Sequence, residues 1–403
     1  MHTLDPYSRA TMEFTLTWRS DEAVHVERQW ADPVNCWRDI LPPELAQALL
    51  GKGPGDRVET AIPAAGFVAL YDERKRVRIR PDQFQAMDGN GQPLTPWVGR
   101  YYPQGLLRSV SGVFKESTSP CRFLGWEDDR MLFDLNHPLA GRDLKLGVEI
   151  VTIHPRQGKE RGGRCEDWLE RVSSGGPGMQ ARWTGQESAL FAEAHFMRAD
   201  PQPDALFYRQ ARLVHHLDST ARAEINRQYA ALIRPGSRVL DLMGSWTSQL
   251  PDSLELAGLT VLGLNEEELR HNRQATETLA QDLNSESRLP YAEEHFDAVV
   301  CTAAVEYLTN PLAVMAEIRR VLRPGGVLAF AFSNRWFPPK AIRLWSELHE
   351  FERLGLVAEL FHQTGGFSGV TTLSRRGLPR PLDDPHQELW LSDPLYMVWG
   401  SKV

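Results

Sequence analysis

Residues 237–251 have the sequence SRVLDLMGSWTSQLP, a short apolar run followed directly by a turn of small and hydroxyl residues. Four more apolar runs of strand length follow, at residues 259–265, 296–303, 326–333 and 395–402. Helix-like segments at residues 268–280 and 311–323 lie between some of them. Strands that alternate with helices are typical of a parallel sheet covered on both faces. We therefore predict a doubly wound α/β domain of the Rossmann type over residues 205–403.

The turn after the first run has the features of a ligand site. Ligands of doubly wound sheets bind at the carboxyl ends of the strands, beside the switch in strand order. Asp241 lies at the end of the first run, and Gly244 and Ser245 allow the backbone to come close to a ligand. The second run ends at Asn265, followed by Glu266, where such folds place a side chain that hydrogen-bonds ribose hydroxyls.

The order and spacing of these segments resemble one family. The matching segments are VLDL at 239–242, GLN at 263–265, QDLN at 281–284, VEYL at 305–308 and RVLRPGGVLAFAFSN at 320–334. Together they resemble a class I S-adenosylmethionine-dependent methyltransferase of the type-11 group, over about residues 206–345. The turn DLMGSW and the upstream segment FYRQARLVHHLD, residues 207–218, are similar to one branch of that group. A nucleotide-dependent oxidoreductase is disfavoured because no G-x-G-x-x-G follows any predicted strand.

The resemblance implies S-adenosylmethionine as the cofactor and in-line displacement at its methyl carbon as the chemistry. It implies that Asp282 accepts a hydrogen bond from the adenine amino group and that Leu283 covers the ring face. The predicted cofactor-binding residues are Asp241, Gly244, Ser245, Trp246, Asn265, Glu266, Asp282, Leu283 and Cys301. No catalytic residue is assigned.

Side chains after the later strands are candidates for contact with the methyl acceptor. They are Glu306, Tyr307, Asn334 and Arg335. Tyr307 also fits simple packing, and Glu306 also fits a solvated charge at the start of a helix. His215 and His216 precede the first strand, where they face either the cofactor or the solvent.

Two departures from the family pattern leave an alternative open. The first turn has one glycine where two or three are usual, and Asn265 replaces the usual acidic ribose partner. Asparagine still hydrogen-bonds hydroxyls, but a neutral acceptor is weaker than a carboxylate. A domain that keeps the fold without the cofactor is therefore the alternative.

The first part of the chain, residues 1–154, has a different pattern. Six short strands are predicted, at residues 12–18, 56–62, 76–80, 121–126, 130–135 and 144–153. A helix is predicted at residues 42–51, with Pro at its first turn and Gly51 after its end. These features predict a mostly antiparallel β domain with one helix. Residues 155–204 contain the Gly-rich stretches 156–164 and 173–180 and are predicted to be a linker or a lid.

The segment FDLNHPLAGRDLKLGVEIVTI, residues 133–153, resembles the end of SlyD-type FKBP domains, which have an α+β fold. The helix and turn at 44–56 are similar to that family, and the insertion from Arg80 to Asp129 occupies the place of its chaperone flap. The resemblance implies a peptide-binding or peptidyl-prolyl isomerase role. Leu146 stands where the family has an aromatic residue, and VHVERQW has no counterpart of the family's acidic residue. Peptide binding is therefore favoured over isomerase activity.

Two functions from different classes remain. One is a methyltransferase with an FKBP-like module that recruits the substrate or binds a peptide. The other is a prolyl isomerase or folding helper with a catalytically silent methyltransferase-like domain, and a pure interaction protein is a weaker third.

Composition limits the partners. The net charge of −8 disfavours nucleic acid and anionic membranes, so we expect a small molecule or a protein as methyl acceptor. Four cysteines lie far apart, and no Cys/His spacing predicts a metal site. So few thiols, with no signal peptide and no long apolar run, predict a cytoplasmic protein.

Overall fold

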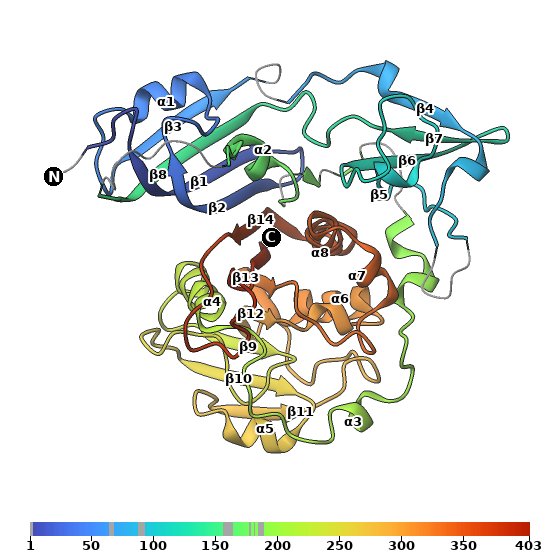
Figure 1. Cartoon of the computed structure of the whole chain (residues 1–403). Helices are drawn as coiled ribbons and strands as arrows, with labels where there is room; N and C mark the ends of the chain where they lie inside the picture. The colour runs from blue at the N-terminus through green and yellow to red at the C-terminus, as the bar shows by residue number, and fades with distance from the viewer. Residues whose placement is uncertain are drawn as a thin grey trace.

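The computed structural model describes residues 3–63, 68–87, 93–155, 164–176, 179–180, 182–183 and 189–403. The Gly-rich stretches 156–164 and 173–180 lie partly outside these ranges. In Figure 1 the N-terminal strands lie above the C-terminal α/β part. Among the described residues, no helix combines the length and apolar character needed to cross a membrane.

The C-terminal part is built on parallel strands in the order β11-β10-β9-β12-β13. Their bounds are β9 Arg238–Leu242, β10 Gly258–Gly263, β11 Glu277–Ala280, β12 Phe296–Thr302 and β13 Leu322–Phe332. The chain moves outward from β9 to β11 on one side and then crosses to β12 and β13 on the other. The switch in strand order therefore lies between β9 and β12, where ligands of such sheets bind.

Helices cover both faces of this sheet, as predicted for a doubly wound fold. The helices are α4 Ser219–Leu232, α5 Glu266–His271, α6 Pro311–Val321, α7 Arg343–Glu347 and α8 Glu350–Thr364. Leu240 and Leu242 of β9 pack in one core with side chains of α6 and α8. Val239, which points to the opposite face, packs in a second core with Ile225 and Tyr229 of α4.

The helix predicted at residues 268–280 is wrong in its second half. Helix α5 ends at His271, and residues Glu277–Ala280 form β11, which pairs in parallel with β10. The amide of Asn272 donates to the carbonyl oxygen of Ser245 and to Ser248 Oγ, which turns the chain away from the helix. Pairing with a neighbouring strand thus overrides the local helical pattern.

The N-terminal part is a β domain with one helix, as predicted. An antiparallel sheet in the order β2-β1-β8-β3 is formed by β1 Arg9–Arg19, β2 Val24–Asn35, β3 Arg57–Ile62 and β8 Leu144–Ile153. Helix α1, Pro43–Leu49, follows β2. A second sheet in the order β4-β7-β6-β5 is formed by β4 Arg76–Ile79, β5 Tyr101–Pro103, β6 Pro120–Glu127 and β7 Arg130–Asp134. The similarity to FKBP domains stays a prediction.

Part of the predicted linker is folded onto this β domain. Residues Trp168–Ser173 form α2, and the Trp168 ring stacks on Phe14 of β1 with ring centroids 5.6 Å apart. The short helix α3, Asp204–Phe207, comes at its end. The boundaries at 154 and 205 stay a prediction.

One sheet runs through both parts of the chain. Strand β15, Leu395–Lys402, pairs antiparallel with β13 and with β14, Phe367–Arg376. Strand β14 then pairs in parallel with β2, from Thr371 opposite Val24 to Arg376 opposite Gln29. Figure 1 shows β14 directly below the N-terminal sheet. Neither β2 nor β14 was among the predicted strands.

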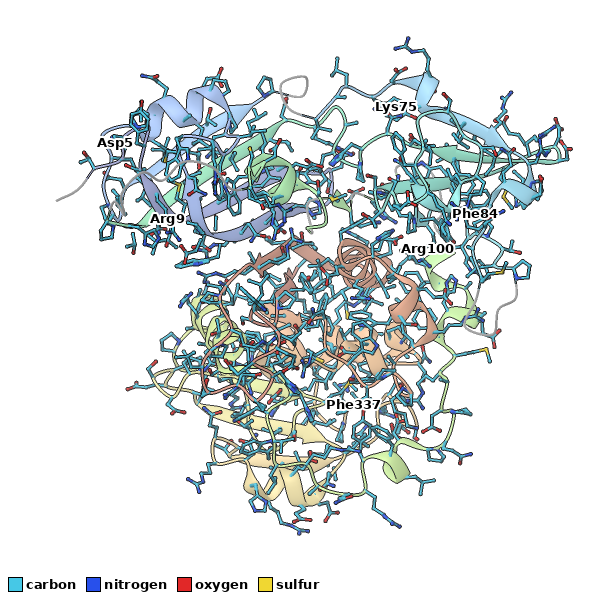
Figure 2. All side chains as sticks on the ribbon, viewed as in Figure 1. Asp5, Arg9, Lys75, Phe84, Arg100 and Phe337 are labelled. Carbon is cyan, nitrogen blue, oxygen red and sulfur yellow. The ribbon has the colours of Figure 1, made fainter. Side chains whose placement is uncertain are left out.

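Buried ion pairs hold the two parts together. Arg375 of β14 lies between Glu13 of β1, with 3.1 Å from Nε to Oε1, and Glu224 of α4. Arg376 pairs with Glu27 of β2 in the same way. Further along, Arg100, labelled at the junction in Figure 2, donates to Glu352 of α8 at 3.1 Å.

We expect Arg375→Ala to lower the free energy of unfolding by about 3–5 kcal/mol, because it removes the buried cation between Glu13 and Glu224 and leaves each carboxylate only a more exposed arginine, Arg28 or Arg227. Urea unfolding measures this loss. Arg57→Ala is the control, since its pair with Glu149 is largely exposed, and we expect a change within about 1 kcal/mol. Equal effects of the two variants would contradict the structural role of Arg375.

Candidate functional site

A cavity of about 190 Å³ lies at the carboxyl ends of β9, β10 and β12. Its walls include Met243 and Gly244 after β9, Asn265 after β10, and Ala303 after β12. One side is closed by residues from 204 to 217, which we call the strap. The cavity therefore lies beside the switch in strand order, where the sequence predicts the cofactor.

Two strand ends turn sharply at this cavity. Met243 has φ 58° and Ala303 has φ 51°, both in the left-handed region that residues other than glycine seldom adopt. Each such residue costs about 1–2 kcal/mol, and strain of this kind clusters at ligand sites. The turns direct the backbone after β9 and β12 into the cavity wall.

Gly244 and Gly263 allow the first turn to lie against β10. The backbone N–H of Gly244 donates to the carbonyl oxygen of Leu262 at 2.7 Å. A Cβ atom on Gly263 would lie only 2.2 Å from the Gly244 carbonyl oxygen. The close approach of these two backbones is therefore possible only for glycine at position 263.

The carboxylate of Asp241 helps to hold the turn after β9 in place. Its carboxylate is buried and accepts a hydrogen bond from Ser248 Oγ at 2.5 Å. Burial raises the pKa of Asp241 from its ordinary value near 3.8 to about 7, and the Ser248 bond partly opposes this rise. Asp241 lines the cavity, as predicted, and also shapes the turn above it.

Asn265 lines the cavity, but its amide is fully engaged. Its Oδ1 accepts from the backbone N–H groups of Glu267 and Glu268 and so caps α5. Its Nδ2 donates to the carbonyl oxygens of Tyr208, at 2.8 Å, and Arg209, at 3.2 Å, in the strap. The neighbouring Glu266 is exposed and pairs with a residue of its own helix.

The predicted turn residues Ser245 and Trp246 also line the cavity. Ser245 Oγ donates to Glu268 at 2.6 Å, and Trp246 Nε1 donates to the carbonyl oxygen of Val214 at 3.2 Å. The Trp246 ring lies beside His215, with centroids 4.6 Å apart. The strap is thus bonded to the residues that the sequence predicts for the cofactor.

The other predicted cofactor residues divide into two groups. Asp282 and Leu283 line the cavity, and Asp282 accepts bonds from Asn284 N and Ser285 Oγ at 2.9 Å each. Cys301 lies within β12 in the hydrophobic core, where burial raises the pKa of its thiol.

Of the candidates for acceptor contact, Tyr307 lines the cavity. Its hydroxyl accepts from the backbone N–H of Phe337 at 2.9 Å, and the two rings are stacked with centroids 6.2 Å apart. His216 packs edge-on against Phe337, and burial, Arg212 and Arg335 lower its pKa.

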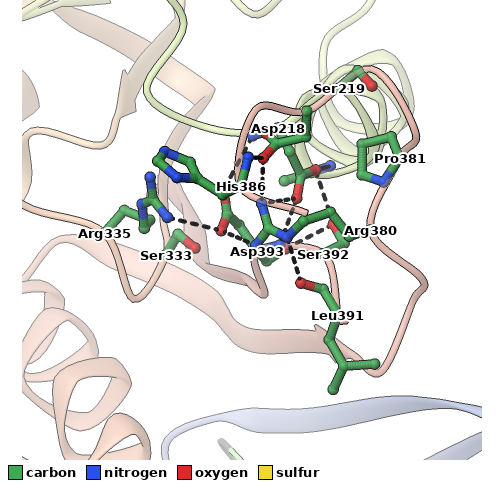
Figure 3. A network of polar contacts seen from close by, with 12 residues as sticks. Asp218, Ser219, Ser333, Arg335, Arg380, Pro381, His386, Leu391, Ser392 and Asp393 are labelled. Carbon is green, nitrogen blue, oxygen red and sulfur yellow. Dashed lines mark hydrogen bonds and ion pairs between the residues drawn. The ribbon is translucent and has the colours of Figure 1, made fainter. Parts of the chain in front are cut away.

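The alternative of a solvated charge at Glu306 is wrong. Its side chain is buried, Oε2 has no hydrogen-bond partner among the described residues, and burial raises its pKa to about 8. Asn334 is exposed, and Arg335 turns toward Asp393 at 3.8 Å, in the polar network of Figure 3. The structure thus brings Tyr307 to the cavity and directs Arg335 elsewhere.

Several cavity residues were missed from the sequence. They are Asp204, Arg222 and Asn284. Asn284 donates to Asp204 and to the carbonyl oxygen of Tyr307, so it links the strap to the segment after β12. Only Asn284 has a sequence signal, because it directly follows the predicted pair Asp282 and Leu283.

The raised pKa of Asp241 makes stability depend on pH. The folded state binds this proton more tightly than the unfolded chain, so stability is lost as pH rises from about 4 to about 7. We expect Asp241→Asn to remove up to about 1.4 kcal/mol per pH unit of this loss. Urea unfolding from pH 5 to 8 measures it, with exposed Asp252→Asn as control. Parallel curves for wild type and Asp241→Asn would contradict it.

Comparison with known proteins agrees with this geometry. Residues 243–330 match the family described as "Methyltransferase domain". The ubiquinone/menaquinone biosynthesis C-methyltransferase UbiE of Cupriavidus necator is 32% identical over 115 residues, 26% of this chain and 47% of that protein. UbiE of Paraburkholderia phymatum is 33% identical over 122 residues, 27% of this chain and 49% of that protein. The chain thus spans about half the length of the curated relatives it matches.

Solved structures align more weakly. An S-adenosylmethionine-dependent methyltransferase of Mesorhizobium loti is 14% identical, covering 44% of this chain and 96% of that one, with a TM-score of 0.30. A TehB-like methyltransferase of Corynebacterium glutamicum is 13% identical, covering 44% and 87%, also with a TM-score of 0.30. Residues 243–330 are thus similar to methyltransferase domains, and the curated relatives that they resemble are C-methyltransferases.

Proposed function

We propose that this protein transfers a methyl group from S-adenosylmethionine to an acceptor bound beside the cavity of its C-terminal part. The observation that carries the proposal is the position of the cavity at the carboxyl ends of β9, β10 and β12, since the matched segment begins directly after β9 and contains β10 and β12. Ligands of doubly wound sheets bind there.

The residues around the cavity fit this cofactor. The Gly244 turn presents backbone close to the cavity, as an amino-acid end requires, and Asp282 and Leu283 offer a carboxylate and an apolar face for adenine. S-adenosylmethionine supplies a methyl group already activated on a sulfonium. The protein's contribution is then mainly alignment and exclusion of water. His216 also lines the cavity, and burial lowers its pKa, so its imidazole is neutral there.

The strap must move for the cofactor to enter. The cavity of about 190 Å³ is smaller than the roughly 300–1,000 Å³ typical of ligand sites. The strap occupies one wall and is bonded to Asn265, Glu268 and Trp246. Release of these contacts opens the cavity and frees Asn265 Nδ2 for ribose.

Aromatic side chains indicate the kind of acceptor. Tyr208, Tyr307 and Phe337 line the cavity, and their faces suit a flat or cationic small molecule. The net charge of −8 favours such an acceptor, or a protein, over nucleic acid. The scattered free cysteines favour a cytoplasmic location.

Calorimetric titration of the full chain with S-adenosylmethionine tests the proposal, and we expect saturable binding below about 1 mM. Gly263→Ala should weaken this binding at least tenfold, because its Cβ pushes the Gly244 turn away from β10. Gly258→Ala is the control, since its Cβ would meet Thr276 Oγ1 at 3.4 Å. No binding by the wild type would defeat the proposal.

A second candidate function belongs to the N-terminal part. A larger cavity, of about 1150 Å³, is lined by residues of the β domain, α2 and the start of α8, among them Ile62, Leu169 and Phe351. Its size supports the peptide-binding role that the FKBP resemblance implies. A proline-peptide isomerisation assay with the full chain separates peptide binding from catalysis, and we expect no rate above buffer. A clear acceleration would instead support the isomerase.

A further inference from the structure

Arg222 is a cation of the smaller cavity that has no partner among the described residues. It lies in the first turn of α4 and lines the cavity at the carboxyl end of β9. Its side chain makes no hydrogen bond or ion pair with any residue that the structure describes, and its Nε is buried without an acceptor. A buried donor left unsatisfied is costly, so this arrangement calls for an explanation.

The other charged groups around the cavity are already satisfied. The Arg212 guanidinium donates to the carbonyl oxygen of Phe207 at 3.1 Å and lies over aromatic rings. Asp204 is paired with Arg198 at 2.7 Å and with Lys340 at 3.3 Å. Glu268 accepts from Ser245 and from a strap N–H. Asp241 and Asp282, which also line the cavity, accept hydrogen bonds from Ser248, Asn284 and Ser285. No described carboxylate of the cavity forms an ion pair with Arg222.

A positive charge is also unfavourable in the first turn of α4, where Arg222 lies. The first turn of a helix carries partial positive charge, which favours anions. Helix α4 has no acidic residue in that turn, although Asp218 caps it. A bound anion would interact favourably with the partial positive charge of the first turn and would give Arg222 a partner.

The charge of Arg222 acts at the Trp246 side of the cavity. Burial and then Arg222 lower the pKa of His215, whose ring lies 4.6 Å from that of Trp246. Trp246 belongs to the turn after β9, which follows Gly244 and Ser245. The free cation and the backbone turn thus border the same end of the cavity.

We propose that Arg222 binds the carboxylate of the cofactor's amino-acid end. The proposal rests on the proposed function and names the residue of this chain that orients the ligand. The guanidinium plane matches a carboxylate with two parallel hydrogen bonds, which lysine cannot provide.

The experiment compares two ligands that differ at this end. S-adenosylhomocysteine carries the carboxylate, and 5′-methylthioadenosine has the same adenosyl sulfur without it. Calorimetry on the full chain measures both for wild type, Arg222→Ala, Arg222→Lys and Arg234→Ala. Arg234 is an exposed arginine beyond the end of α4, so its variant removes the same charge away from the cavity.

We expect Arg222→Ala to weaken S-adenosylhomocysteine binding at least tenfold and to leave 5′-methylthioadenosine within twofold. Arg222→Lys should fall between Arg222→Ala and wild type, and Arg234→Ala should match wild type. Unchanged S-adenosylhomocysteine binding in Arg222→Ala would overturn this assignment alone. An equal loss for both ligands would also overturn it, because it indicates a structural role. A wild type that binds neither ligand would overturn the proposed function as well.

Discussion

The pairing of β14 with β2 is the contact on which the architecture depends. A strand at the edge of a sheet leaves backbone N–H and C=O groups unpaired, and here each part of the chain satisfies the edge of the other. Arg375 and Arg376 of β14 place their guanidinium groups on buried carboxylates of the N-terminal strands. Charges so deeply buried are tolerated only when paired, so the two sheets are held in one register.

The ion pairs of Arg375 also connect the cavity to the N-terminal sheet. Glu224, which shares Arg375 with Glu13, lies in α4 two residues after Arg222. The helix that forms one side of the cavity is therefore anchored to the N-terminal sheet. The N-terminal part is a fixed support for the cavity of the C-terminal part, and a freely swinging module is inconsistent with the continuous sheet.

The strand ends were predictable, and much of what surrounds them was not. Strand β8 occupies the predicted residues 144–153, and Asp241, Gly244 and Asp282 line the cavity as predicted. These predictions succeed because apolar runs and the turns after them depend on neighbouring residues. Parallel strands also bring their carboxyl ends to one edge of the sheet. The predicted helix at 268–280 failed because its second half gains a strand partner in β10.

The amino-acid order alone predicts the alternation of strands and helices, the turn after β9 and the methyltransferase-like order of the motifs. The three-dimensional fold was needed to see that β2 pairs with β14, that the strap engages Asn265, and that Arg222 has no partner among the described residues. The difference comes from distance along the chain. Strand propensity and turn chemistry are set by neighbouring residues, whereas edge pairing and charge neutralisation depend on groups hundreds of residues apart, such as Glu13 and Arg375.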